Sequence, residues 1–195
     1  MVHADITQST NRHVVVRSGW VIDGSGAEAR TGVDLVVEDG LIVGLFATGT
    51  YDVPDDAIVI DASGSTVMPG IVDAHFHVSY CNHLGMQELE WPKSLEYQSA
   101  CAVHNAERAL MSGVTSAMDV GGRGAIGLAL RQMLDDGMGV GPRLRVSAQM
   151  IDAPGGAVDL WPSGVSIPEN HRLGILVSGV DEMRSAVRRQ IKLGV

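Results

Sequence analysis

The pattern of apolar residues changes at Pro69-Gly70, and this change limits the folds open to the chain. From Val14 to about Val67, short strand-like runs alternate with glycine turns and no useful helical period occurs. After Pro69-Gly70, strand-like runs alternate with helix-length segments, as in right-handed βα units around a parallel sheet. The sequence therefore predicts a small all-β domain at residues 1–68 and an α/β domain at residues 69–195.

Turn residues divide the first part into strands. Val33 to Glu38 and Leu41 to Phe46 flank Asp39-Gly40, a dipeptide suited to the positive φ angles of a tight hairpin turn. Ala57 to Asp61 and Thr66 to Met68 are further strand-like pieces. We therefore expect a small sheet of five or six strands before the α/β part begins.

The second part contains three strand-like runs separated by helix-length segments. The expected strands are 71–75, 114–118 and 143–147, and the expected helices are about 94–111, 125–136 and 180–193. The segment from Asp152 to about Leu176 contains several Gly and Pro residues and is expected to be a long loop, which in compact domains is more often functional than idle.

His75 and His77 lie at the C-terminal end of the first expected strand of this part. Residues two apart on a strand leave the same face, so both imidazoles can converge on one ion, at about 2.0–2.1 Å if it is zinc. The pair alone is a weak signal, because seven His in 195 residues give about 0.25 chance His-x-His pairs. Its place favours a metal site, since active-site residues of (β/α)₈ barrels lie at that end of the strands.

The segment from Val67 to His77 resembles the opening motif of the amidohydrolase superfamily, close to its imidazolonepropionase-like and prolidase-like members. It reads Val-Met-Pro-Gly-Ile-Val-Asp-Ala-His-Phe-His. Gly113 to Gly122 resembles the second-strand segment of that family, and Gly141 to Leu144 resembles the lead-in to its third strand. The resemblance covers nearly the whole chain and corresponds to the N-terminal portion of such an enzyme.

This resemblance implies a small β-domain beside a (β/α)₈ TIM barrel with one or two divalent metal ions, zinc above all, at its mouth. A metal-activated water would hydrolyse an amide, cyclic amide or dipeptide C–N bond. His75 and His77 would be the first two ligands, whereas the later ligands and the general-base Asp of the family have no counterpart up to Val195. We therefore expect an incomplete barrel of about three βα units, truncated before strand four, and an inactive isolated chain.

Four further residues are candidates for contact with substrate. His83 follows the first strand of the barrel, and Asp119 and Arg123 lie at or just past the end of the second, where side chains reach the mouth. For Asp119 and Arg123 the alternative is a solvated or salt-bridged loop residue. Asp159 matches the Asp of a Gly-Gly-His-Gly-Asp segment in some prolidase-like relatives, but Ala157 replaces the His of that segment.

Two other functions fit parts of the sequence. Gly122 to Gly127 matches G-x-G-x-x-G between a strand and a helix, which is typical of dinucleotide binding, although the next strand end around Ser147 to Gln149 has no acidic residue for the ribose. The chain could also be a non-catalytic fragment, or one member of a split assembly completed by the remaining barrel segment or by further copies of itself.

Composition restricts the partners. The net charge of −9 and the lack of a Lys/Arg run argue against nucleic acid and anionic membranes as partners and leave a small-molecule substrate. No apolar run approaches the ~20 residues needed to span a bilayer. The N-terminal residues do not resemble a signal peptide, and two Cys are too few for a disulfide framework, so we expect a cytoplasmic protein.

Overall fold

The structure, a computed structural model, describes residues 13–81, 84–91 and 93–195. Contacts divide the chain into two units that meet at Pro69 and Gly70, and each unit is described by itself. Whether each unit is an independent domain stays a prediction. No helix in these ranges is long and apolar enough to cross a membrane.

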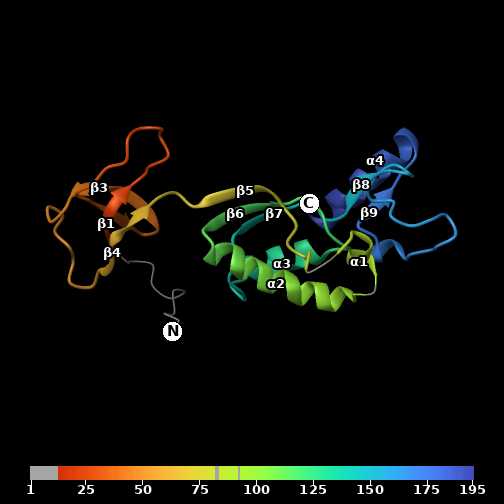
Figure 1. Cartoon of the computed structure of the whole chain (residues 1–195), viewed down its shortest axis with the longest axis horizontal. Coiled ribbons are helices and arrows are strands. Elements are labelled where there is room, and N and C mark those ends of the chain that lie inside the picture. Colours follow the sequence, from red (N-terminus) through yellow and green to blue (C-terminus); the bar gives the residue numbers. More distant parts are fainter. Residues whose placement is uncertain (1–12, 82–83, 92) are drawn as a thin grey trace. The chain divides into compact units, whose positions relative to one another are not determined.

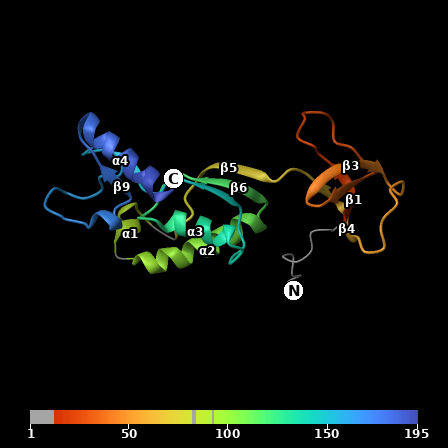
Figure 2. The ribbon, with the colours of Figure 1, turned by 180° about the vertical axis from the view of Figure 1, so that it is seen from behind.

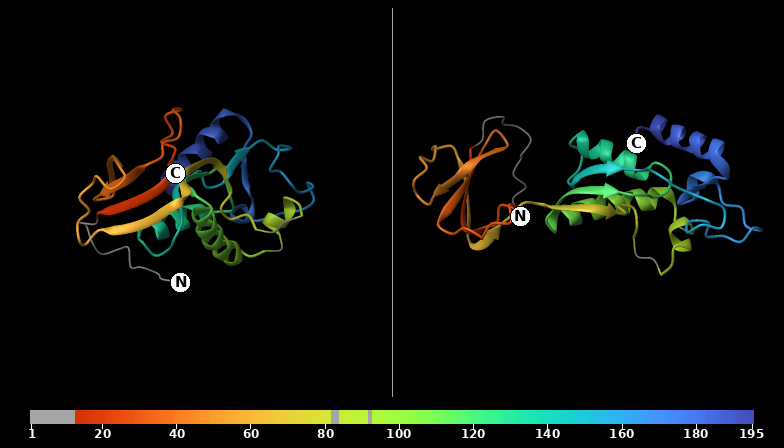
Figure 3. Two further views of the ribbon diagram at one scale, coloured as in Figure 1. Left: turned by 60° about the vertical axis from the view of Figure 1, so that its left-hand side comes forward. Right: turned by 90° about the horizontal axis from the view of Figure 1, so that it is seen from above.

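The first unit is built on one four-stranded sheet (Figure 1). Its strands are β1 (Val14–Val21), β2 (Val33–Glu38), β3 (Leu41–Ala47) and β4 (Ile58–Val67), in the order β3-β2-β1-β4. β1 is antiparallel to β2 and parallel to β4, and the sheet is connected by one tight turn, between β2 and β3, and by two longer segments. β1 and β4 lie side by side in the left view of Figure 3.

The turns and strands of this unit can be compared with those expected from the sequence. The hairpin between β2 and β3 turns at Asp39 and Gly40, whose φ angles of 49° and 77° are both positive, as the sequence predicted. The strand-like pieces at 57–61 and 66–68 fall within or beside the single strand β4. The described residues of this unit therefore contain four strands, and the expectation of five or six was wrong.

The second unit has a parallel three-stranded sheet with the order β5-β6-β7. These strands are Ile71–Phe76, Val114–Asp119 and Arg143–Val146, and they alternate with α2 (Leu95–Met111) and α3 (Ile126–Asp135). α2 and α3 lie on one side of the sheet (Figure 1 and right view of Figure 3). This arrangement is the succession of βα units that the sequence predicted.

The core of the second unit lies between this sheet and its two helices. Leu144 and Val146 of β7 are buried there with Ala117 of β6, whereas the alternating Arg143 and Arg145 are exposed. The period of two along β7 therefore separates a helix-packed face of the sheet from an open one.

The remaining elements follow the ends of β5 and β7. A short helix α1 (Gln87–Glu90) precedes α2. After β7 come β8 (Met150–Asp152), a 3₁₀ turn at Glu169–His171, and β9 (Gly174–Leu176), which pairs in parallel with β8. α4 (Gly179–Leu193) then ends at Gly194 (Figure 2). The expected loop at 152–176 thus contains a strand and a 3₁₀ turn.

Candidate metal centre

The rings of His75 and His77 are neighbours at the C-terminal end of β5. Their centroids are 5.2 Å apart and their planes meet at 79°. His75 is exposed on the strand, and its backbone N–H donates to Asp73 Oδ1 at 3.1 Å. His77 follows directly after the strand and is partly buried. The structure therefore brings the two predicted ligands together.

One nitrogen of His77 is already engaged. Nδ1 lies 2.7 Å from the carbonyl oxygen of Gly121, just past the end of β6. A carbonyl oxygen only accepts, so Nδ1 carries the proton and a neutral ring has its lone pair on Nε2. A histidine that binds a metal ordinarily donates its other ring N–H in this way. Gly121 was not among the residues that the sequence analysis selected.

Backbone hydrogen bonds join the C-terminal ends of the three parallel strands. Val120 N–H donates to Phe76 O at 3.0 Å, and Ser147 N–H donates to Asp119 O at 2.9 Å. Gly122 N–H donates to the carbonyl of Ala148 at 3.0 Å. These bonds hold the loop after β6 between the other two strand ends, and so fix the carbonyl that His77 contacts.

Asp119 lies at this rim but faces the packed interior. Its side chain is 2% exposed, and burial raises the pKa of its carboxyl to about 6, against the lowering effect of the Gly121 and Val78 amides and of His77. The carboxyl of Asp119 is therefore enclosed by protein groups. The predicted contact of Asp119 with substrate stays a prediction.

Arg123 is 1% exposed and bonds to three other segments. Its Nη1 donates to Leu89 O at 3.0 Å, to Lys93 O at 2.6 Å and to Gln98 Oε1 at 3.1 Å. Its Nη2 donates to His171 Nδ1 at 2.8 Å. One guanidinium thus joins the loop after β6 to the segments that follow β5 and β7. Its predicted contact with substrate is untested.

Glu90 complements this arginine and was missed by sequence analysis. It is 1% exposed, and its carboxylate accepts from Leu173 N–H at 2.6 Å and from the indole N–H of Trp161. Its charge opposes the effect of burial, which lowers the pKa of Arg123. Nothing in the local sequence distinguishes Glu90 from a surface carboxylate, because its partners lie more than 30 positions away.

Asp159, another predicted contact residue, lies in the segment between β8 and β9. Asp159 accepts from Gly155 N–H at 2.9 Å and lies 3.9 Å from Arg172 Nη1. Asp152, at the end of β8, accepts from the amides of Ala153 and Val158 and has a lowered pKa for that reason. His83 lies outside the described residues.

Comparison with known proteins identifies the family of this chain. The model of the amidohydrolase family matches residues 66–195, which include every element of the second unit. The chain belongs to the amidohydrolase family.

Three relatives show how much of an amidohydrolase this chain represents. A dihydroorotase of Caldanaerobacter subterraneus subsp. tengcongensis is 45% identical over 65 residues, which are 33% of this chain and 14% of that protein. A D-hydantoinase of Streptomyces coelicolor is 32% identical over 123 residues, which are 62% and 23%. The crystal structure of a prolidase complexed with N-methylphosphonate-L-proline superposes with a TM-score of 0.79 and 26% identity, covering 94% of this chain and 45% of the prolidase. The chain thus spans less than half of each relative.

Packing and backbone conformation explain two glycines of the G-x-G-x-x-G match, Gly124 and Gly127. A Cβ on Gly127 would stand 2.2 Å from Asp119 Oδ2 and 2.9 Å from Val146 Cγ1, and Gly124 has a φ of 53°. Close helix–sheet contact and a left-handed turn account for both positions without a nucleotide.

The donor set fits part of a metal site. His75 and His77 provide two imidazoles, and no group of three or more His, Cys, Asp or Glu able to hold an ion occurs among the described residues. A catalytic zinc usually takes three protein ligands. The described residues therefore offer two imidazole donors here, one fewer than such a zinc usually takes.

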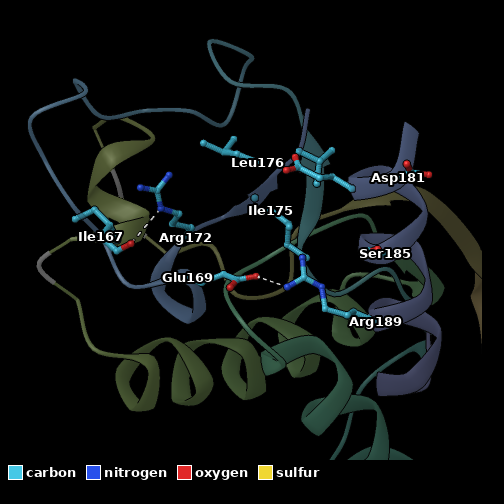
Figure 4. A pocket seen from close by; sticks show the side chains of 11 residues that line it. Ile167, Glu169, Arg172, Ile175, Leu176, Asp181, Ser185 and Arg189 are labelled. Carbon is cyan, nitrogen blue, oxygen red and sulfur yellow. Dashed lines mark hydrogen bonds and ion pairs between the residues drawn. The ribbon is translucent and has the colours of Figure 1, made fainter. Parts of the chain in front are cut away.

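The cavity in Figure 4 lies elsewhere. It has a volume of about 670 Å³ and is bounded by the 3₁₀ turn, β9 and α4. Glu169 and Arg189 form an ion pair of 3.0 Å across it, and Arg172 Nε donates to Ile167 O at 3.1 Å. Neither His75 nor His77 lines this cavity. The candidate centre is therefore located by its two imidazole side chains and not by the size of a cavity.

Proposed function

We propose that residues 70–195 form the first three βα units of an amidohydrolase barrel and that His75 and His77 bind a divalent metal ion, in the ordinary case zinc, at its mouth. Residues 13–69 would contribute to the small β-domain beside it. The observation that carries the proposal is the imidazole pair at the ends of parallel strands, with Nδ1 of His77 committed to Gly121.

The reaction class that we propose for the whole catalytic unit is hydrolysis of a C–N bond in a small molecule, in keeping with the dihydroorotase and the D-hydantoinase among its relatives. A bound divalent ion supplies Lewis acidity and lowers the pKa of water at its open position. His75 and His77 would hold this ion, and the Gly121 carbonyl would keep the proton on Nδ1 of His77.

The other predicted site residues take different places in this proposal. Asp119 and Arg123 are buried with protein neighbours, so we assign them to holding the strand ends and loops. Asp159 is partly exposed and remains the candidate for substrate contact. A general base is not assigned to any described residue.

Metal titration tests the proposal. The 195-residue chain, freed of metal with chelator, is titrated with Co²⁺ and Zn²⁺ beside the variants His75→Ala and His77→Ala. Each substitution is expected to abolish specific binding, whereas His104→Ala, on the exposed side of α2, leaves it unchanged. Equal binding by all four proteins would refute the metal site.

The same samples test activity. With two protein ligands, the isolated chain is expected to give no turnover of cyclic amides or Xaa-Pro dipeptides. Turnover that persists with tightly bound metal would show that the chain is a working hydrolase by itself.

A further inference from the structure

Two contacts hold the imidazole of His77, one on the face of the ring and one at its edge. The ring of Tyr80 stacks on it with a centroid distance of 4.2 Å and an interplanar angle of 1°. At the edge, Nδ1 contacts the Gly121 carbonyl at 2.7 Å. The stack restricts tilting of the ring and the hydrogen bond restricts its rotation, so together they define the direction of Nε2.

A tight turn brings Tyr80 over His77. The backbone N–H of Tyr80 donates to the carbonyl of His77 at 3.2 Å, which closes a turn between the two residues. The amide of Asn105 on α2 pins this turn, because its Nδ2 donates to Val78 O at 2.9 Å and to Tyr80 O at 2.8 Å. The rigid helix is therefore linked to the histidine through the turn and the stacked ring.

The other histidine of the pair lacks this support. His75 is exposed and meets His77 edge to face, and its backbone N–H, not its ring, donates the hydrogen bond to Asp73. The terminal torsion of a histidine is broad, so an unsupported imidazole samples many ring orientations. Before any ion binds, the orientation of the His77 ring is therefore more restricted than that of the His75 ring.

We propose that Tyr80 and Asn105 are positioning residues that orient the His77 imidazole so that Nε2 is presented to a metal ion. This inference rests on the proposed function, since it assigns a purpose to the free nitrogen of His77. Tyr80 acts here through its aromatic face: burial raises the pKa of its phenol to about 12, so the ring stays neutral. Asn105 acts through the turn, to whose carbonyls its side chain donates.

The expected size of the effect follows from the ordering of the ligand. Changing a partner that orients a metal-binding histidine typically lowers metal affinity about 10- to 100-fold. Tyr80→Leu removes the stack, and Asn105→Leu removes both anchors of the turn but keeps the aromatic ring. Tyr80→Phe keeps the ring and is expected to retain affinity within about 3-fold, because the stack needs no hydroxyl.

The experiment measures Co²⁺ affinity and the visible spectrum of bound Co²⁺ in the 195-residue chain and these three variants. Tyr80→Leu and Asn105→Leu are expected to bind at least 10-fold more weakly and to show an altered spectrum. His104→Ala, adjacent to Asn105 on α2, is the matched control. Wild-type affinity and spectrum in both leucine variants would overturn the inference, and if one of them fails to fold, the other decides.

A metal-free measurement separates this inference from the proposed function. Nitrogen-15 NMR of the imidazoles reports the tautomer of His77, which is expected to be Nδ1–H alone in the wild type and in Tyr80→Phe, and a mixture in Tyr80→Leu. Failure of the wild type to bind Co²⁺ would refute the metal site while the tautomer still tests positioning. A single Nδ1–H tautomer in both leucine variants would refute positioning.

Discussion

Gly127 on α3 lies so close to Asp119 at the end of β6 that an added Cβ would stand 2.2 Å from Asp119 Oδ2. Gly→Ala inside a helix ordinarily stabilises by about 1 kcal/mol. Here we expect the opposite sign, with Gly127→Ala lowering the free energy of unfolding by about 1–3 kcal/mol through overpacking. Urea unfolding followed by tryptophan fluorescence measures this. Gly164→Ala, where a Cβ meets open space, is the control, and equal stability of both variants would contradict the packing argument.

The raised pKa of Asp119 predicts a pH-dependent stability. Its carboxyl has a pKa of about 6 in the fold, above the ordinary 3.8, so folding favours the protonated form. Stability from this group is therefore present below about pH 4 and is lost as the pH rises to about 6. In metal-free protein, Asp119→Asn should match the wild type at pH 4 and exceed it at pH 8 by up to about 3 kcal/mol. A constant difference across this range in urea unfolding would exclude the mechanism.

Substitution of the buried Arg123 should loosen three segments at once. Arg123→Met removes one donor from each of the carbonyls of Leu89 and Lys93, and it removes the positive charge that interacts with the buried Glu90. We expect a loss of about 3–5 kcal/mol. Limited proteolysis should then cleave within residues 153–172. Arg184→Met, which breaks an exposed ion pair on α4, should cost less than about 1 kcal/mol, and similar losses for both arginines would argue against a buried junction.

The isolated chain should associate with itself. β5 and β7 are the edges of the parallel sheet, and Val72 on its surface is 71% exposed. α4 adds exposed apolar residues at helical spacing, namely Val180, Met183, Val187 and Ile191. Analytical ultracentrifugation should show concentration-dependent association that Val187→Lys reduces and Ser185→Lys does not. A monomer at all concentrations would contradict this expectation.

Local sequence patterns predicted most of the helices and strands of the second unit. Gly113 and Gly137 end α2 and α3 in positive φ conformations, and the strands between them follow apolar runs with the expected bounds to within a residue or two. The histidine pair was found for the same reason, because a spacing of two residues and the strand end are both visible in sequence. The family resemblance at Val67 to His77 was confirmed by the family match.

Long-range partners were invisible to this reasoning. Arg123 sits among glycines that suggest an open loop, yet its partners come from Leu89, Gln98 and His171. The bond from His77 to Gly121 spans 44 positions, and the short helix that contains Glu90 has too few residues for a period. Such contacts depend on how parallel strands bring their following loops together, which no local period encodes.

The hydrogen bonds of Arg123 also constrain how the loops of this chain can be exchanged. Because one side chain bonds to segments after β5 and β7 from the loop after β6, the structures of these loops depend on one another. Grafting only one of them from another amidohydrolase should leave the buried guanidinium without some of its acceptors, whereas transplanting all three together should preserve every bond. An exchange of loops in this scaffold should therefore succeed only when the three segments are replaced as a set.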